Sequence, residues 1–150
     1  MFRLIMLLLA LLAAPARAVE LDPTGWAQLV AAAQHGFALA DVRDKSRFRR
    51  ADHWEIADAQ GGDCEDKALL ARAALVAQGW PQASLRIALV WTEAREYHAV
   101  LTVDVVRHGA AATYVIDNRF PWVLGWDALS QHGYRWDRRQ AGRGWTRIGN

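Results

Sequence analysis

The stretch YHAVLTVDVVRHGAAATYVIDN, which begins at Tyr97 and ends at Asn118, constrains the fold more than any other part of the sequence. Its two halves alternate apolar with polar residues and are rich in β-branched and aromatic side chains. They are separated by His108 and Gly109, a pair suited to a tight turn. Alternation around a short glycine-containing turn is typical of a β-hairpin.

The register of this hairpin follows from its apolar pattern. With a two-residue loop, Leu101 faces Ile116 and Val103 faces Tyr114. This pairing places apolar side chains on one continuous face. A slip by one residue would bring polar side chains onto that face, so we expect the register to be well defined.

The same register brings two ionisable residues together on the other face of the hairpin. His98 and Asp117 become diagonal neighbours there, within reach of a side-chain hydrogen bond. A shift by two residues would keep them on the same face. The pairing that builds a core therefore also predicts a His–Asp pair.

Two helices are predicted ahead of the hairpin. The first covers Thr24–His35, with Thr24 as its N-cap and Gly36 as its end. The second follows Asp63 as N-cap, with Asp66 in an Asp variant of the capping box, and ends at a Gly-Trp-Pro sequence.

The order of elements predicts a single α+β domain, with helices first and an antiparallel sheet after them. Residues 84–92 and 144–148 supply further strands, whereas the aromatic remainder of 120–150 is expected to be irregular. Residues 41–62 are interpreted as a long loop with one short helical turn. Loops of this length in small domains are often functional.

The first eighteen residues have the pattern of a secretory signal peptide. Arg3 precedes an apolar run, and Ala16-Arg17-Ala18 forms a small-x-small cleavage site. An uncleaved anchor is the alternative. We expect residues 19–150 to form one domain. We expect the protein to be periplasmic or secreted. Removal of the two arginines takes the formal charge from +2 to neutral, which gives no support for a nucleic-acid partner.

Cys64 is the only cysteine in the chain. A lone thiol in an exported protein is either reactive or intermolecular. A buried apolar role is the alternative, and the acids Asp63, Glu65 and Asp66 beside it argue against that role, because burial next to carboxylates is costly.

The position of Cys64 suits an activated nucleophile. A helix N-terminus and a neighbouring imidazolium both lower the pKa of a thiol. If the sheet packs on the helix face that carries Cys64, His98 can act as base and Asp117 can orient it. We therefore predict a Cys–His–Asp triad for acyl transfer.

Three carboxylates lie within four residues at the start of this helix. Asp63, Glu65 and Asp66 are hard oxygen donors of the kind that bind Ca²⁺, although their spacing is not that of an EF-hand. Capping and compensation of the helix dipole explain the same acids. Both interpretations stay open. A zinc site is disfavoured, since the sequence has no Cys-x-x-Cys and no close histidine pair.

The segments ADHWEIADAQGGDCEDKALLARAAL, YHAVLTV and YVIDNR resemble the bacterial transglutaminase-like cysteine proteinase family. The resemblance covers residues from Trp54 to Trp122. It implies a papain-like, transglutaminase-type fold in which Cys64 is the nucleophile, His98 the general base and Asp117 the orienting residue.

The family resemblance also implies a metal, a substrate groove and partners. It assigns calcium to Asp63 and Glu65, with Asp66 as a further ligand, and places Trp54 in the groove. It implies a protein substrate, such as a biofilm adhesin, and an inner-membrane receptor that senses cyclic di-GMP. Lys67 departs from the family, which commonly has an aromatic residue there.

The expected function is that of an exported, calcium-assisted cysteine endopeptidase. An acyltransferase of transglutaminase type, with an amine in place of water, uses the same triad and is an alternative. A non-catalytic calcium- or protein-binding module is a second alternative, and the intact triad argues against it.

Overall fold

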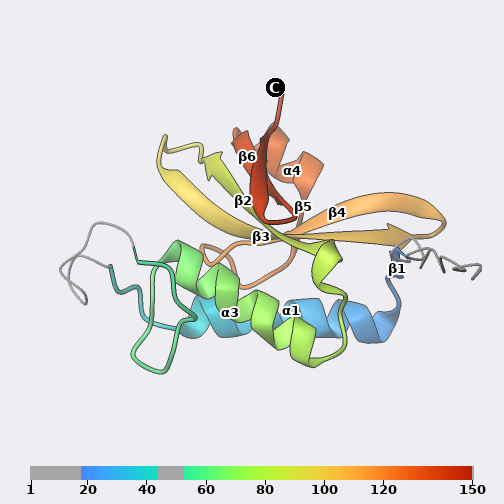
Figure 1. Cartoon of the computed structure of the whole chain (residues 1–150), viewed down its shortest axis with the longest axis horizontal. Helices are drawn as coiled ribbons and strands as arrows, with labels where there is room; N and C mark the ends of the chain where they lie inside the picture. The colour runs from blue at the N-terminus through green and yellow to red at the C-terminus, as the bar shows by residue number, and fades with distance from the viewer. Residues whose placement is uncertain (1–17, 44–52, 150) are drawn as a thin grey trace, which may run out of the picture.

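A seven-stranded sheet forms the centre of the protein, with α1 and α3 side by side under one face and α4 on the other (Figure 1). The computed structural model describes residues 18–43 and 53–149. In chain order the elements are β1 (Val19–Glu20), α1 (Pro23–Ala38), α3 (Cys64–Ala77), a 3-10 turn (Gln82–Ser84), β2 (Leu85–Trp91), β3 (Tyr97–Arg107), β4 (Ala110–Ile116), β5 (Leu124–Gly125), α4 (Trp126–Gln131), β6 (Arg135–Ala141) and β7 (Gly144–Arg147).

The sheet order is β5-β4-β3-β2-β6-β7, and β1 adds a short parallel pairing to β3. All other pairings are antiparallel. The predicted α+β class, with the Cys64 helix packed on an antiparallel sheet, is confirmed. Within the described residues, no helix is long and apolar enough to cross a membrane.

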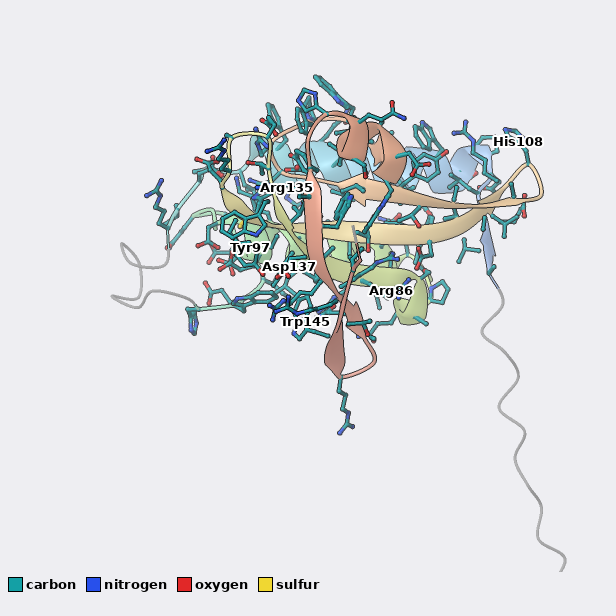
Figure 2. The ribbon with its side chains drawn as sticks, turned by 90° about the horizontal axis from the view of Figure 1, so that it is seen from above. Arg86, Tyr97, His108, Arg135, Asp137 and Trp145 are labelled. Atoms are coloured by element: carbon teal, nitrogen blue, oxygen red, sulfur yellow. The ribbon has the colours of Figure 1, made fainter. Side chains whose placement is uncertain are left out.

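The β3–β4 hairpin has the predicted register. Leu101 pairs with Ile116 and Val103 with Tyr114, around a turn in which His108 and Gly109 both have positive φ. Positive φ at both central residues is the geometry of a type I′ turn, which matches the twist of the strands. Figure 2 shows His108 at the tip of the hairpin, remote from the end where β3 begins.

The helix α1 begins earlier and ends later than the sequence predicted. Its N-cap is Asp22, whose Oδ1 accepts a hydrogen bond from the Gly25 N–H at 2.6 Å. The predicted cap at Thr24 was therefore wrong. Gly36 does not end the helix, because it is a buried packing position: a Cβ there would lie 3.9 Å from the Cβ of Lys67 on α3.

The helix α3 begins after Asp63, as predicted, and its apolar face packs on the sheet. Ala68, Ala71 and Leu75 are buried on that face. The predicted capping box was wrong. Within the described residues the Asp63 side chain makes no capping hydrogen bond, and Asp66 Oδ1 accepts the Glu55 N–H instead.

Two glycines shape the chain that leads into α3. Gly61 has φ of +101°, and a Cβ there would lie 2.3 Å from the Ala40 carbonyl oxygen. At Gly62 a Cβ would lie 2.7 Å from the Cβ of Asp66 and 2.9 Å from that of Ala57. Only glycine allows this close approach, so both residues fix where α3 starts.

The described parts of the predicted loop, 41–43 and 53–62, contain isolated bridges and no helix. Residues 44–52 and the predicted signal peptide, apart from Ala18, lie outside the described residues, so these predictions stay untested.

The segment after Phe120 is more regular than predicted. It forms β5, α4, β6 and β7, and β6 pairs directly with β2. The strand β6 was missed because its sequence, RWDRRQA, has charged residues at most positions. One of these charges, Arg139, is largely buried and forms an ion pair with Asp104.

The sheet has a hydrophobic core on each side. The core under α1 and α3 includes Leu29, Leu75, Ile87, Leu101 and Val103. The core on the opposite face is formed by Ala88, Val90, Val100, Val115, Leu129, Tyr134 and Trp136. β3 is therefore buried on both faces, and a polar residue on it must find its partners inside the protein.

Asp104 of β3 joins four strands through its carboxylate. Its oxygens accept hydrogen bonds from Arg86 of β2 at 2.6 Å, Arg139 of β6 at 2.8 Å and Thr113 of β4 at 2.8 Å. Burial alone would raise the pKa of Asp104, but the bonds from Arg139, Thr113 and Arg86 outweigh burial and hold this pKa below its usual value.

The variant Asp104→Asn should lower the free energy of unfolding at pH 7 by about 1–3 kcal/mol, because Arg86 and Arg139 lose their shared carboxylate. A lowered carboxyl pKa stabilises the fold above the unfolded value of about 3.9, and this contribution is lost as pH falls through the folded value. The difference from wild type should therefore shrink below about pH 4 in urea denaturation. Equal stability at pH 7 would contradict this role.

Candidate active site

Cys64 is the first residue of α3 and lies half-buried where the helix meets the end of the sheet. Its Sγ donates a hydrogen bond to Glu65 Oε2 at 3.1 Å. A small cavity beside the thiol is lined by residues of α1, α3, β3 and the chain around the end of β4: Ala33, Gly36, Cys64, Lys67, Ala68, Ala99, Ile116 and Asn118.

The surroundings of Cys64 favour the protonated thiol. Burial is the largest effect and raises the pKa of Cys64, and the nearby carboxylates of Glu65 and Asp63 raise it further. The backbone of Ala99 acts in the opposite direction and lowers this pKa. In this arrangement the group is therefore a thiol bound to Glu65, and activation requires a base to take its proton.

His98 and Asp117 form the predicted contact. His98 Nε2 lies 2.8 Å from Asp117 Oδ1, and both side chains are buried. Because Asp117 occupies Nε2, Nδ1 is the ring nitrogen left to exchange a proton with another group. The contact follows from the register, but the catalytic roles of the two residues stay predictions.

Asp117 is held as a charged carboxylate. Burial would raise its pKa, but hydrogen bonds from His98, from the Tyr134 hydroxyl and from the Arg119 backbone outweigh burial and lower it. The Tyr134 hydroxyl donates to Oδ2 at 2.6 Å, and the Arg119 N–H donates to Oδ1 at 2.9 Å. The carboxylate thus accepts bonds at both oxygens and has a defined orientation.

Ala99 is the residue that links the positions of Cys64 and His98. Ala99 follows His98 on β3, and its backbone lies beside the Cys64 thiol. Among the described residues, no hydrogen bond joins the Cys64 thiol to the His98 ring, since the thiol is bound to Glu65. The structure thus brings His98 and Asp117 into contact and places Cys64 beside the strand that carries His98.

The three predicted calcium ligands do not form one metal site in the described part of the chain. Burial raises the pKa of Glu65 to about 7, and Asp63 is among the groups that add to this rise, which places the two carboxyl groups near each other. Asp66 is only 1% exposed and holds the Glu55 N–H at 2.8 Å. Across residues 18–43 and 53–149, no three His, Cys, Asp or Glu side chains converge on one metal position.

Trp54 lies on the surface, where a side chain can contact a substrate. It is 37% exposed, and its ring meets that of Trp145 on β7 edge to face, with centroids 6.1 Å apart. Its assignment to substrate binding stays a prediction.

Lys67 fills the position at which the chain departs from the family pattern. The side chain is 2% exposed, and its Nζ donates to the Leu39 carbonyl at 2.8 Å and to Asp41 Oδ1 at 2.5 Å. Lys67 therefore ties the chain after α1 to the start of α3, one helical turn beyond Cys64.

The sequence profile of a known family matches this chain. The profile described as bacterial transglutaminase-like cysteine proteinase matches residues 12–150. The chain belongs to this family. Membership confirms the predicted family and the predicted enzyme class, a cysteine peptidase. A search of curated proteins gives no match.

Solved structures of LapG from Legionella pneumophila share the fold of this chain. Calcium-bound LapG is 21% identical, with a TM-score of 0.63 over 82% of this chain and 71% of that chain. EGTA-treated LapG is 20% identical, with a TM-score of 0.64 over 83% and 67% of the respective chains. At this identity the similarity shows the fold alone.

Two residues at the site were missed by the sequence analysis. Arg119 follows Asp117 by two positions, and this closeness was a signal that could have pointed to it. Tyr134 lies just before β6, a strand that the apolar pattern did not predict. No spacing rule in the sequence links Tyr134 to Asp117, so only the fold could place them together.

Proposed function

We propose that this member of the family is an exported cysteine endopeptidase in which Cys64 is the nucleophile, His98 the general base and Asp117 the residue that orients His98. The observation that carries the proposal is the buried contact between His98 Nε2 and Asp117 Oδ1 at 2.8 Å, since it leaves Nδ1 as the proton acceptor. The Cys64 thiol lies beside the Ala99 backbone, so Cys64 is close to the strand that carries His98.

In the proposed reaction His98 takes the proton from the Cys64 thiol, and the sulfur attacks the carbonyl carbon of a peptide bond. The Cys64 N–H at the start of α3 helps to hold the oxyanion. His98 then gives its proton to the leaving amine, so that the C–N bond breaks and an acyl-enzyme remains. Water, deprotonated by His98, hydrolyses the thioester and restores the thiol.

The export proposal rests on the pattern of Met1–Ala18, and the substrate proposal on the family resemblance. We extend the proposal to a periplasmic location, to a cell-surface protein such as a biofilm adhesin as the substrate, and to an inner-membrane receptor as the regulator.

A calcium ion is the cofactor that we propose for the acids at the start of α3. Asp63 and Glu65 offer hard oxygen donors near each other, and burial together with the neighbouring Asp63 raises the pKa of Glu65. Asp66 fits less well, because its Oδ1 is bound to the Glu55 N–H. A bound cation would offset the acids that raise the pKa of the Cys64 thiol.

Peptide hydrolysis can be tested on a library of peptides made from a digested bacterial proteome. The wild-type protein should create new N-termini, detected by mass spectrometry, and Cys64→Ala should lose at least about 10³-fold of this activity. The melting temperature should change by less than about 4 °C, because the substitution removes one half-buried atom.

Adding a primary amine separates hydrolysis from acyl transfer. Free carboxyl products at high amine concentration support a peptidase, whereas amide products would identify a transglutaminase-type enzyme. Cleavage that survives in Cys64→Ala would refute the nucleophile assignment.

Calcium binding can be tested by thermal unfolding after treatment with EGTA. Calcium at about a hundred times its Kd should stabilise the protein by about 2.7 kcal/mol and raise the melting temperature by about 5–10 °C. The double variant Asp63→Asn, Glu65→Gln should lose this shift. Asp127→Asn, which removes an acid from the first turn of α4, should keep it. An unchanged melting temperature in wild type would contradict a calcium site.

A further inference from the structure

A line of hydrogen bonds runs from the His98–Asp117 pair toward the surface. Asp117 is 0% exposed and Tyr134 is 3% exposed. The Tyr134 hydroxyl donates to Asp117 Oδ2 at 2.6 Å and accepts from Arg119 Nη1 at 2.8 Å. Arg119 in turn makes a two-nitrogen ion pair with Glu93. The line therefore ends in charged groups that are about one-third exposed.

The two oxygens of Asp117 have different partners. Oδ1 receives His98 Nε2 and the Arg119 N–H. Among the described residues, Oδ2 receives a hydrogen bond from Tyr134 alone. Without the hydroxyl, a buried carboxylate oxygen would lack a donor, and rotation of the carboxylate would no longer be restrained on that side.

We propose that Tyr134 is a positioning residue that fixes the Asp117 carboxylate and, through it, the ring of His98, with Arg119 and Glu93 holding the Tyr134 hydroxyl in place. This inference rests on the proposed function, since it assigns Tyr134 a part in orienting the general base. Tyr134 touches neither the thiol nor the proposed substrate, and it acts through Asp117.

The charge state of each group suits this role. Burial raises the pKa of Tyr134, and the Asp117 charge raises it further, so the hydroxyl remains a donor across the physiological range. The hydrogen bond from Arg119 lowers the pKa of Glu93 to about 2, so this acid stays ionised. The far end of the line is thus a pair of charged groups.

Three separate segments of the chain meet in this arrangement. Glu93 comes from the β2–β3 loop, Arg119 from the chain after β4, and Tyr134 from the junction of α4 and β6. The Tyr134 ring also packs in the hydrophobic core on the face of the sheet opposite α1 and α3. It lies near Trp136 there, at a centroid distance of 6.2 Å. The variant Tyr134→Phe keeps this packing and removes only the hydroxyl.

The test is the tautomer of His98, read from two-dimensional ¹⁵N–¹H spectra of histidine-labelled protein above pH 7. The wild-type ring should hold its proton on Nε2, the nitrogen bound to Asp117. In Tyr134→Phe the ratio of the Nε2–H to the Nδ1–H form should fall at least about fivefold, because Asp117 is no longer fixed. Hydrolysis of the peptide library should fall about tenfold, as for other supporting hydrogen bonds.

Tyr97→Phe is the matched control. Tyr97 donates its hydroxyl to Asp137 at 2.7 Å in an exposed pair that has no link to Asp117 (Figure 2). Its removal deletes the same kind of bond one residue from His98 and should leave the His98 tautomer unchanged. If Tyr134→Phe fails to fold, Glu93→Gln should shift the same ratio by about twofold, since it weakens the hold on Arg119 at the surface.

An unchanged His98 tautomer in a folded Tyr134→Phe, or in Glu93→Gln where the first variant is unfolded, would overturn the inference. An equal change in Tyr97→Phe would overturn it as well, because the effect would then not depend on Asp117. Failure of the proposed function gives a different result: the wild type would not cleave the library, while the tautomer measurement would still report on Tyr134.

Discussion

The buried carboxylate of Asp117 is the constraint on which the site depends. A charge with no exposed surface is costly unless donors surround it, and here the donors come from β3, from the chain after β4 and from the end of α4. The carboxylate is therefore satisfied only when these three segments are in place.

The parts of the fold that the sequence predicted share a physical cause. The β3–β4 register could be predicted because apolar alternation and a tight turn specify the same pairing, and the His98–Asp117 contact came with it. The strand β6 could not be predicted in this way, because most of its residues are charged, and the partner of buried Arg139, Asp104, comes from another strand. Tyr134 was missed for the same reason, since β6 positions it.

The acids around Cys64 show a conflict that the sequence only partly revealed. A helix N-terminus lowers the pKa of a thiol, but burial with Glu65 and Asp63 raises it, and burial is the larger effect at Cys64. The sequence could indicate the number of acids but not their hydrogen-bond partners. Asp66 turned out to hold the Glu55 backbone, which leaves Asp63 and Glu65 as the pair that a cation would compensate.

The central claim is that His98, oriented by Asp117, takes the proton of Cys64. The most direct test is the rate of Cys64 alkylation by iodoacetamide at pH 7 with calcium present, compared between wild type, His98→Ala and the control His108→Ala at the hairpin tip. We predict that His98→Ala slows alkylation at least about tenfold, whereas His108→Ala leaves it unchanged. Equal rates in wild type and His98→Ala would contradict this account.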